Sequence, residues 1–104
     1  PISVAPYDIA IIPMINKNDN SALNKANKIN LELEKNNIET IIDDTDENLS
    51  SKIKKMNLIG AAYQIIIGKQ TDGDLLEFKE IGKESRKINL AEIIKIIKEL
   101  KATN

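Results

Sequence analysis

The sequence predicts an α/β protein: a three-layer α/β/α domain in which three helices flank a five-stranded mixed sheet. Residues 7–14 and 63–67 are apolar without alternation, which is typical of buried central strands. Segments with apolar residues at helical spacing separate the first three apolar runs, so right-handed parallel crossovers are expected. Two later runs, 75–81 and 84–88, are separated by only two residues, and so short a connection favours an antiparallel hairpin.

The first strand and first helix have recognisable ends. Pro13 has no N–H to donate, so strand pairing is expected to fail near it. Ser21 is predicted as the helix N-cap, and the helix is expected to end at Asn36 and Asn37, since asparagine tolerates left-handed backbone. The buried side of this helix is formed by Ala22, Ala26, Ile29 and Leu33.

The remaining elements complete the order β-α-β-α-β-β-β-α. A short second strand is expected over residues 38–42. The second helix follows, with Asn48 or Ser50 as candidate N-cap, and stops at Gly60; its inner side comprises Leu49, Ile53, Met56 and Gly60. A closing helix carries an apolar stripe formed by Leu90, Ile93, Ile94, Ile97 and Leu100.

Composition limits the function. A chain of 104 residues is about one domain, and its net charge of -1 argues against a strongly basic nucleic-acid binder, although a local basic patch is still compatible with it. The chain has no cysteine and no histidine, which removes disulfides, thiolate or imidazole metal sites and histidine-activated nucleophiles. No run is long enough to span a membrane, and no signal peptide is visible, so a cytoplasmic protein is expected. Because the chain opens at Pro1, we expect a fragment of a longer protein.

Asp43 and Asp44 follow the predicted second strand, where ligands gather in open α/β sheets. One interpretation is a metal-assisted phospho-acceptor site, but that chemistry also needs carboxylates after the first strand, where Pro13 and Met14 stand instead. The structural interpretation is that one aspartate caps a turn and the other is solvated. Ligand binding within a larger protein is the third alternative.

A small basic cluster is predicted on the second helix, formed by Lys52, Lys54 and Lys55, with Lys69 as a candidate extension. A solvated helix face is the favoured interpretation of this cluster. Ile53 and Asn57 are neighbours on one side of the same helix, with Ile53 expected in the core. Glycine-rich phosphate loops are missing, so neither catalytic nor metal-binding residues are predicted.

Several strings, taken in order, resemble the C-terminal anticodon-binding domain of class II aminoacyl-tRNA synthetases. They are Ala5-Pro6-Tyr7 through Ile12-Pro13-Met14, Ile41-Ile42-Asp43-Asp44, Met56-Asn57-Leu58-Ile59-Gly60 and Ile65-Ile66-Ile67-Gly68. The tail resembles that of the prolyl enzymes, on the strength of Asp72-Gly73-Asp74, Phe78-Lys79 and Gly82-Lys83-Glu84. The resemblance implies one domain over residues 1–104, at the C-terminus of a longer synthetase.

The resemblance also implies a function without catalysis in this domain. Such domains hold the anticodon loop, here that of tRNA(Pro), while an attached catalytic domain uses ATP and Mg to charge the tRNA with proline. No cofactor is expected in this fragment. A homodimer is expected of the full-length enzyme, with the fragment itself monomeric. Loop bases are read by splaying, stacking and hydrogen bonding of their edges, and lysines hold the phosphates.

Residues are transferred from the family position by position. The resulting anticodon-binding set is Asp44, Ile53, Asn57, Gln64, Lys69 and Gln70. The prolyl enzymes have an aromatic or apolar residue at the Ile53 position and an acid at the Asn57 position, which accepts from guanine N1 and N2. Departures from the pattern are Ser50, Thr45 and Ala62, which replace a glycine, an arginine and a proline, and Asn57, whose uncharged amide makes weaker bonds than an acid.

These departures keep two further hypotheses open. The first is an accessory or stand-alone synthetase-like module that recruited the fold for protein or other RNA contacts. The second is a small α/β enzyme or phospho-receiver, for which Asp43 and Asp44 would have to bind metal.

Overall fold

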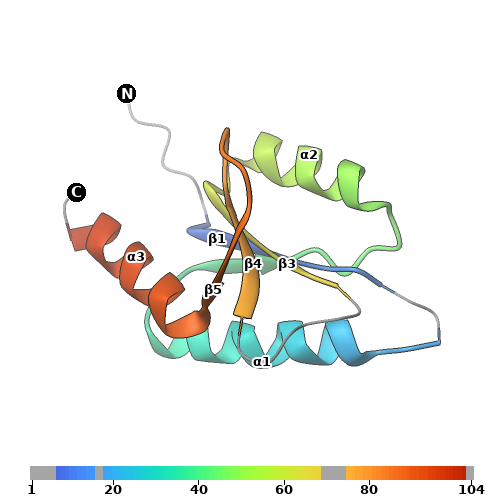
Figure 1. Cartoon of the computed structure of the whole chain (residues 1–104), viewed down its shortest axis with the longest axis horizontal. Coiled ribbons are helices and arrows are strands. Elements are labelled where there is room, and N and C mark those ends of the chain that lie inside the picture. Colours follow the sequence, from blue (N-terminus) through green and yellow to red (C-terminus); the bar gives the residue numbers. More distant parts are fainter. Residues whose placement is uncertain (1–6, 16–17, 69–74, 103–104) are drawn as a thin grey trace.

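The computed structural model describes residues 7–15, 18–68 and 75–102. Eight elements follow one another in the predicted order (Figure 1). They are β1 (Ile9–Pro13), α1 (Ser21–Lys35), β2 (Thr40–Ile42), α2 (Leu49–Ile59), β3 (Tyr63–Ile67), β4 (Leu75–Glu80), β5 (Arg86–Asn89) and α3 (Leu90–Ala102).

The five strands form one mixed sheet in the order β2-β1-β3-β4-β5. Strands β2 and β3 both pair in parallel with β1, whereas β4 is antiparallel to β3 and β5 is antiparallel to β4. The parallel pairs are those joined by helical crossovers, and the antiparallel pairs are formed by strands that follow one another in the order of described elements. The predicted fold class is therefore confirmed.

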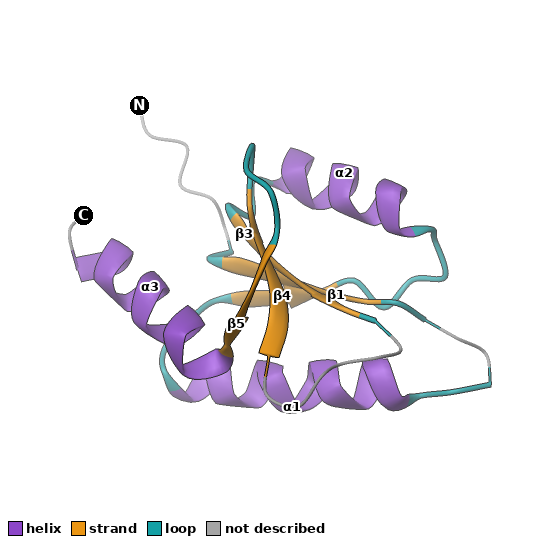
Figure 2. Cartoon of the chain, viewed as in Figure 1, coloured by secondary structure: helices purple, strands orange, loops and turns teal. Residues whose placement is uncertain are grey.

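Helices cover the two faces of the sheet unequally, as Figure 2 shows. On one face, α1 and α3 bury the side chains of alternate strand residues, including Ile11, Ile65 and Phe78. On the other face, Met56 of α2 packs with a smaller cluster that includes Ile12 and Ile66. The three-layer arrangement follows from this alternation, because successive strand residues point to opposite faces.

The helix ends agree with the sequence except at the start of α1. The N-cap of α1 is Asn20, which makes no side-chain capping bond, and Ser21 is already helical, with its N–H donated to the Asp19 carboxylate at 2.9 Å. The prediction of Ser21 as the cap was therefore wrong. Asn37 has a φ of 60° after α1, and Gly60 has a φ of 92° after α2, which confirms both predicted stops.

Pairing stops near Pro13 on one side of β1, as predicted: the register with β2 ends at Ile11 and Ile42, and β1 itself ends at Pro13. On the other side, Pro13 is the register partner of Ile67, and Met14 donates its N–H to the Ile67 carbonyl at 2.8 Å. Because successive residues of β1 bond to opposite neighbours, the donor that proline lacks is missing on the β2 side only. The hairpin connection is longer than predicted, since β4 ends at Glu80 and β5 begins at Arg86; Gly82 has a φ of 81° within it.

Candidate nucleic-acid interface

Helix α2 presents the central candidate residues. Its N-cap is Asn48, whose side chain accepts the Ser51 N–H at 2.9 Å, and the left-handed Gly60 ends it. Between these ends, Ile53 is partly buried against the core and Asn57, one turn later, is exposed. The predicted placement of Ile53 in the core is confirmed.

Asn57 and Gln64 form what we call the amide pair. Gln64, the second residue of β3, is 1% exposed, and its Nε2 donates to Oδ1 of the exposed Asn57 at 2.7 Å. The Oε1 atom of Gln64 is buried and has no hydrogen-bond partner among the described residues. A polar side chain is thus held at the junction of α2 and the sheet with unused hydrogen-bonding capacity.

The other predicted site residues do not all join this pair. Ile42 of β2 and Ile65 of β3 are both register partners of Ile11 in β1. Along the strand direction, Asp44 therefore lies two residues after this row of partners, and Gln64 lies one residue before it. That offset is about 10 Å along the strands if the backbone stays extended. Asp44 is exposed at the opposite end of the sheet from the amide pair. The predicted residues Lys69 and Gln70 lie outside the described residues.

The aspartate pair has the structural role weighed above. The Oδ1 atom of Asp43 accepts the Thr45 N–H at 3.1 Å and its hydroxyl at 2.6 Å, while Oδ2 lies 3.1 Å from Lys55 Nζ. Burial raises the pKa of the Asp43 carboxyl, but the bonds from Thr45 and Lys55 outweigh it and hold that pKa below its usual 3.8. Hydrogen bonds to Glu47 and Asp43 raise the pKa of Lys55. Asp43 therefore closes the loop between β2 and α2.

Asp43→Asn is expected to lower the free energy of unfolding by about 1–2 kcal/mol at neutral pH, because the ion pair is lost. A carboxyl with a depressed folded-state pKa contributes stability above its unfolded pKa, about 3.9, and loses it as the pH falls through the folded value. The difference between wild type and variant should therefore shrink below about pH 4. Urea denaturation at neutral and acidic pH measures it. The exposed Asp44→Asn serves as the control, and a difference that stayed constant with pH would contradict the assignment.

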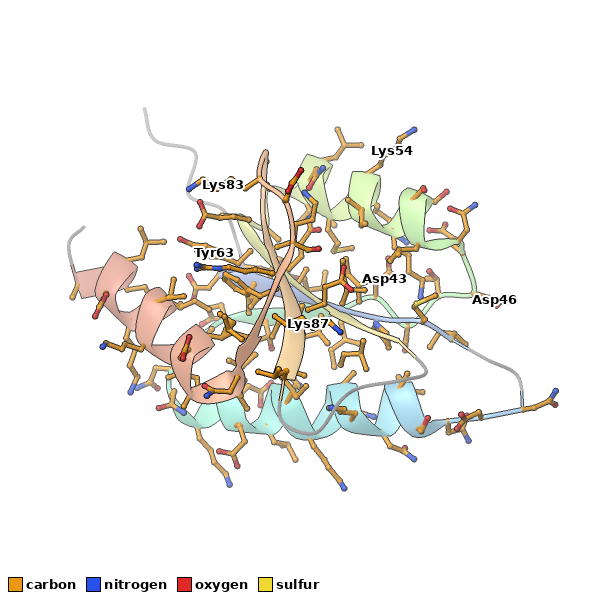
Figure 3. The ribbon with its side chains drawn as sticks, in the orientation of Figure 1. Asp43, Asp46, Lys54, Tyr63, Lys83 and Lys87 are labelled. Carbon is orange, nitrogen blue, oxygen red and sulfur yellow. The ribbon has the colours of Figure 1, made fainter. Side chains whose placement is uncertain are left out.

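The three lysines of α2 do not form one basic cluster. Lys52 is 1% exposed, and its Nζ donates to the carbonyls of Pro13 at 2.9 Å and Asp43 at 3.2 Å. Lys55 is ion-paired with Asp43, and Lys54 is exposed and points away from the sheet (Figure 3). The predicted basic cluster is wrong, and so is the solvated-face interpretation for Lys52, because helical rotation directs neighbouring lysines to different surroundings.

A pocket of about 350 Å³ opens where β1 ends and α2 begins. It is lined by Met14, Ile15, Asp46, Glu47, Asn48, Leu49 and Lys52. Of the predicted anticodon-binding residues that the structure describes, none lines it, and its two carboxylates oppose the approach of a phosphate. Over the described ranges, no group of three or more histidine, cysteine, aspartate or glutamate side chains is placed to hold a metal ion.

A polar strip that sequence reasoning missed lies beside the amide pair. Leu76 and Phe78 of β4 point into the core beneath α3, so Glu77 and Lys79 point to the α2 side of the sheet. Lys79 is the register partner of Gln64, and Lys87 of β5 is the partner of Glu77, which places all four side chains on one face. We call Glu77, Lys79 and Lys87 the open face, because no helix among the described elements packs extensively on it. The period-two alternation in residues 75–79 is the signal that could have identified it.

The fold of this chain also occurs in solved structures of aminoacyl-tRNA synthetases. Two solved structures share it: a prolyl-tRNA synthetase of Cryptosporidium parvum, with a TM-score of 0.80 over 95% of this chain and 22% of that chain at 19% identity, and the RNA-binding domain of a threonyl-tRNA synthetase of the same organism, with a TM-score of 0.78 over 90% and 23% at 13% identity. Residues 8–100 match the model of the anticodon binding domain family. The chain belongs to that family.

The curated relatives of this chain point to one kind of synthetase. A proline–tRNA ligase of Pelagibacter ubique is 64% identical over 104 residues, which are 100% of this chain and 23% of the relative. Another from Rickettsia prowazekii is 42% identical over 77% of this chain and 18% of its own length. The chain thus spans less than a quarter of the length of these ligases, and it corresponds to their anticodon-binding domain. Within the described ranges, none of the helices has the length and apolar character of a membrane span.

Proposed function

We propose that this chain is the C-terminal domain of a cytoplasmic, homodimeric proline–tRNA ligase and that it binds the anticodon loop of tRNA(Pro). The rest of the protein would bind ATP and Mg and join proline to the tRNA. The family match and the 64% identity to a proline–tRNA ligase over the whole chain support this role. This domain would then recognise the anticodon loop and contribute no catalytic group.

The observation that carries the proposal is the position of the amide pair beside the open face. Anticodon bases are single-stranded and can be splayed out, so that a protein reads their edges by hydrogen bonding. Asn57 is exposed on α2, and Gln64 beneath it keeps a buried oxygen without a partner among the described residues. The exposed amide of Asn57, which Gln64 holds in place, is suited to a base edge.

The open face suits the backbone that carries those bases. Lys79 is the immediate cross-strand neighbour of Gln64, and Lys87 lies one strand further on, on the same side of the sheet. Lysine ammonium groups bind phosphates without reading sequence. Glu77, between the two lysines, offsets part of their charge, which limits binding of RNA that makes no base contacts.

Removing either member of the amide pair tests the proposal. In the full-length protein, Asn57→Ala and Gln64→Ala are each expected to raise KM for tRNA(Pro) by roughly 5- to 30-fold, which corresponds to about 1–2 kcal/mol of lost hydrogen bonding. Formation of prolyl-adenylate should stay nearly unchanged, because it occurs without tRNA. Aminoacylation and ATP–pyrophosphate exchange measure the two steps separately.

The control is Asn27→Ala, an exposed asparagine on α1, which covers the opposite face of the sheet. It should leave KM for tRNA unchanged. Equal losses in charging and in adenylate formation for the amide-pair variants would count against an anticodon role, because they would indicate damage to the whole protein.

A further inference from the structure

The amide pair has a fixed direction. Gln64 is the donor, through Nε2, and Asn57 is the acceptor, through Oδ1, at 2.7 Å. If the Gln64 amide were turned over, its Nε2 group would occupy the buried position where Oε1 now has no partner among the described residues. That alternative would place an unpaired NH2 group at the buried position in place of an unpaired oxygen. Buried N–H donors without partners are rarer in proteins than buried carbonyl oxygens without partners, so it is the less stable arrangement.

The direction of this bond determines what Asn57 offers to a ligand. Its Oδ1 already accepts from Gln64 and keeps one lone pair, while Nδ2 keeps both of its N–H donors. Since Asn57 is exposed, these groups face the surface beside the open face. A carboxylate at the same position would present acceptors only, even with one oxygen bonded to Gln64.

We infer that Asn57 reads guanine through O6 and N1, in contrast to a carboxylate, which would read N1 and the exocyclic N2 amine. Its Nδ2–H donates to O6, and Oδ1 accepts from N1–H. The inference rests on the proposed function: proline codons begin with two cytosines, so the second and third bases of the tRNA(Pro) anticodon are guanines. Substitution of the acid by an amide thus exchanges one pair of guanine contacts for another.

Base analogues that lack particular hydrogen-bonding groups of guanine test this inference in the full-length protein. Inosine lacks only the N2 amine of guanine, whereas 2-aminopurine keeps that amine and lacks O6 and the N1 proton. Each analogue is placed singly at the second and third anticodon positions of tRNA(Pro), and kcat/KM for charging is measured for the wild type and Asn57→Asp. At the base that Asn57 contacts, inosine should lower kcat/KM of the wild type by less than about threefold. The same substitution should lower kcat/KM of Asn57→Asp by about tenfold or more. For the wild type, 2-aminopurine should cost about tenfold or more at that base.

The control variant is Asn27→Asp on α1, which makes the same chemical change away from the open face and should show the wild-type ratios. If inosine lowered kcat/KM as much in the wild type as in Asn57→Asp, the inference would be overturned. The proposed anticodon role would be unaffected. If neither analogue at either position altered kcat/KM in any variant, the anticodon role and the inference would both be overturned.

Discussion

Replacing Lys79 and Lys87 together by alanine is expected to lower affinity for tRNA(Pro) by roughly 60-fold at about 50 mM salt and roughly 10-fold at about 200 mM salt. Each phosphate contact to single-stranded nucleic acid contributes about 0.7 to the slope of log affinity against log salt, so two contacts contribute about 1.4. The two fold-changes in affinity are obtained by extrapolating this slope from about 1 M salt, where the electrostatic contribution is taken as zero. The register places both lysines on the open face with Gln64, which is why we expect them to act together.

A salt titration of tRNA binding by the full-length protein measures this slope. The matched control is the double variant Lys95→Ala and Lys98→Ala, which removes the same charge from exposed positions on α3, across the sheet. A loss of similar size in the control would show that net charge alone drives binding. Because phosphate contacts carry no sequence information, the loss should also be the same for tRNA with altered anticodon bases.

Lys52→Ala is expected to lower the free energy of unfolding by about 2–4 kcal/mol. The side chain is 1% exposed, and its Nζ joins the ends of β1 and β2 through the carbonyls of Pro13 and Asp43. Alanine would leave a cavity where the aliphatic stem packs and would leave both buried carbonyls without this donor. The helix that carries Asn57 would then lose one of its attachments to the sheet.

Urea denaturation of the 104-residue chain, followed by circular dichroism, measures the effect. Lys54→Ala, at an exposed position two residues away, should change stability by no more than about 0.5 kcal/mol. Lys52→Met separates the two causes, since it retains most of the volume and removes only the donor; we expect a loss of about 1–3 kcal/mol. A methionine variant as stable as the wild type would show that the free-energy cost of burying the Lys52 ammonium group equals the stabilisation from its two hydrogen bonds.

Much of the fold could be predicted from local patterns. The unbroken apolar runs around Ile11 and Ile65 identified central strands, and Asn37 and Gly60 marked helix ends, because each position demands a particular backbone conformation. The N-cap of α1 was predicted one residue too late: Asn20 is the cap, and the Ser21 N–H is already donated to the Asp19 carboxylate.

The candidate site was predicted less completely. Asn57 and Gln64 were both identified and do meet, but Asp44 lies at the other end of the sheet. Transfer of residues by their position in the sequence takes no account of strand register. Lys79 and Lys87 were missed because their importance depends on which strands are neighbours. Lys52 was assigned to the surface because lysine is rarely buried without partners, and its partners are backbone carbonyls from two other elements.

By itself, the sequence determined the order of elements, the fold class and the family, because periodicity, turn residues and ordered motifs are local properties of the chain. Only the tertiary structure decided that the Gln64 amide donates to Asn57, that two lysines of the hairpin share its face, and that Lys52 points inward. Those outcomes depend on distances between residues far apart in sequence, which sheet register and helix packing set.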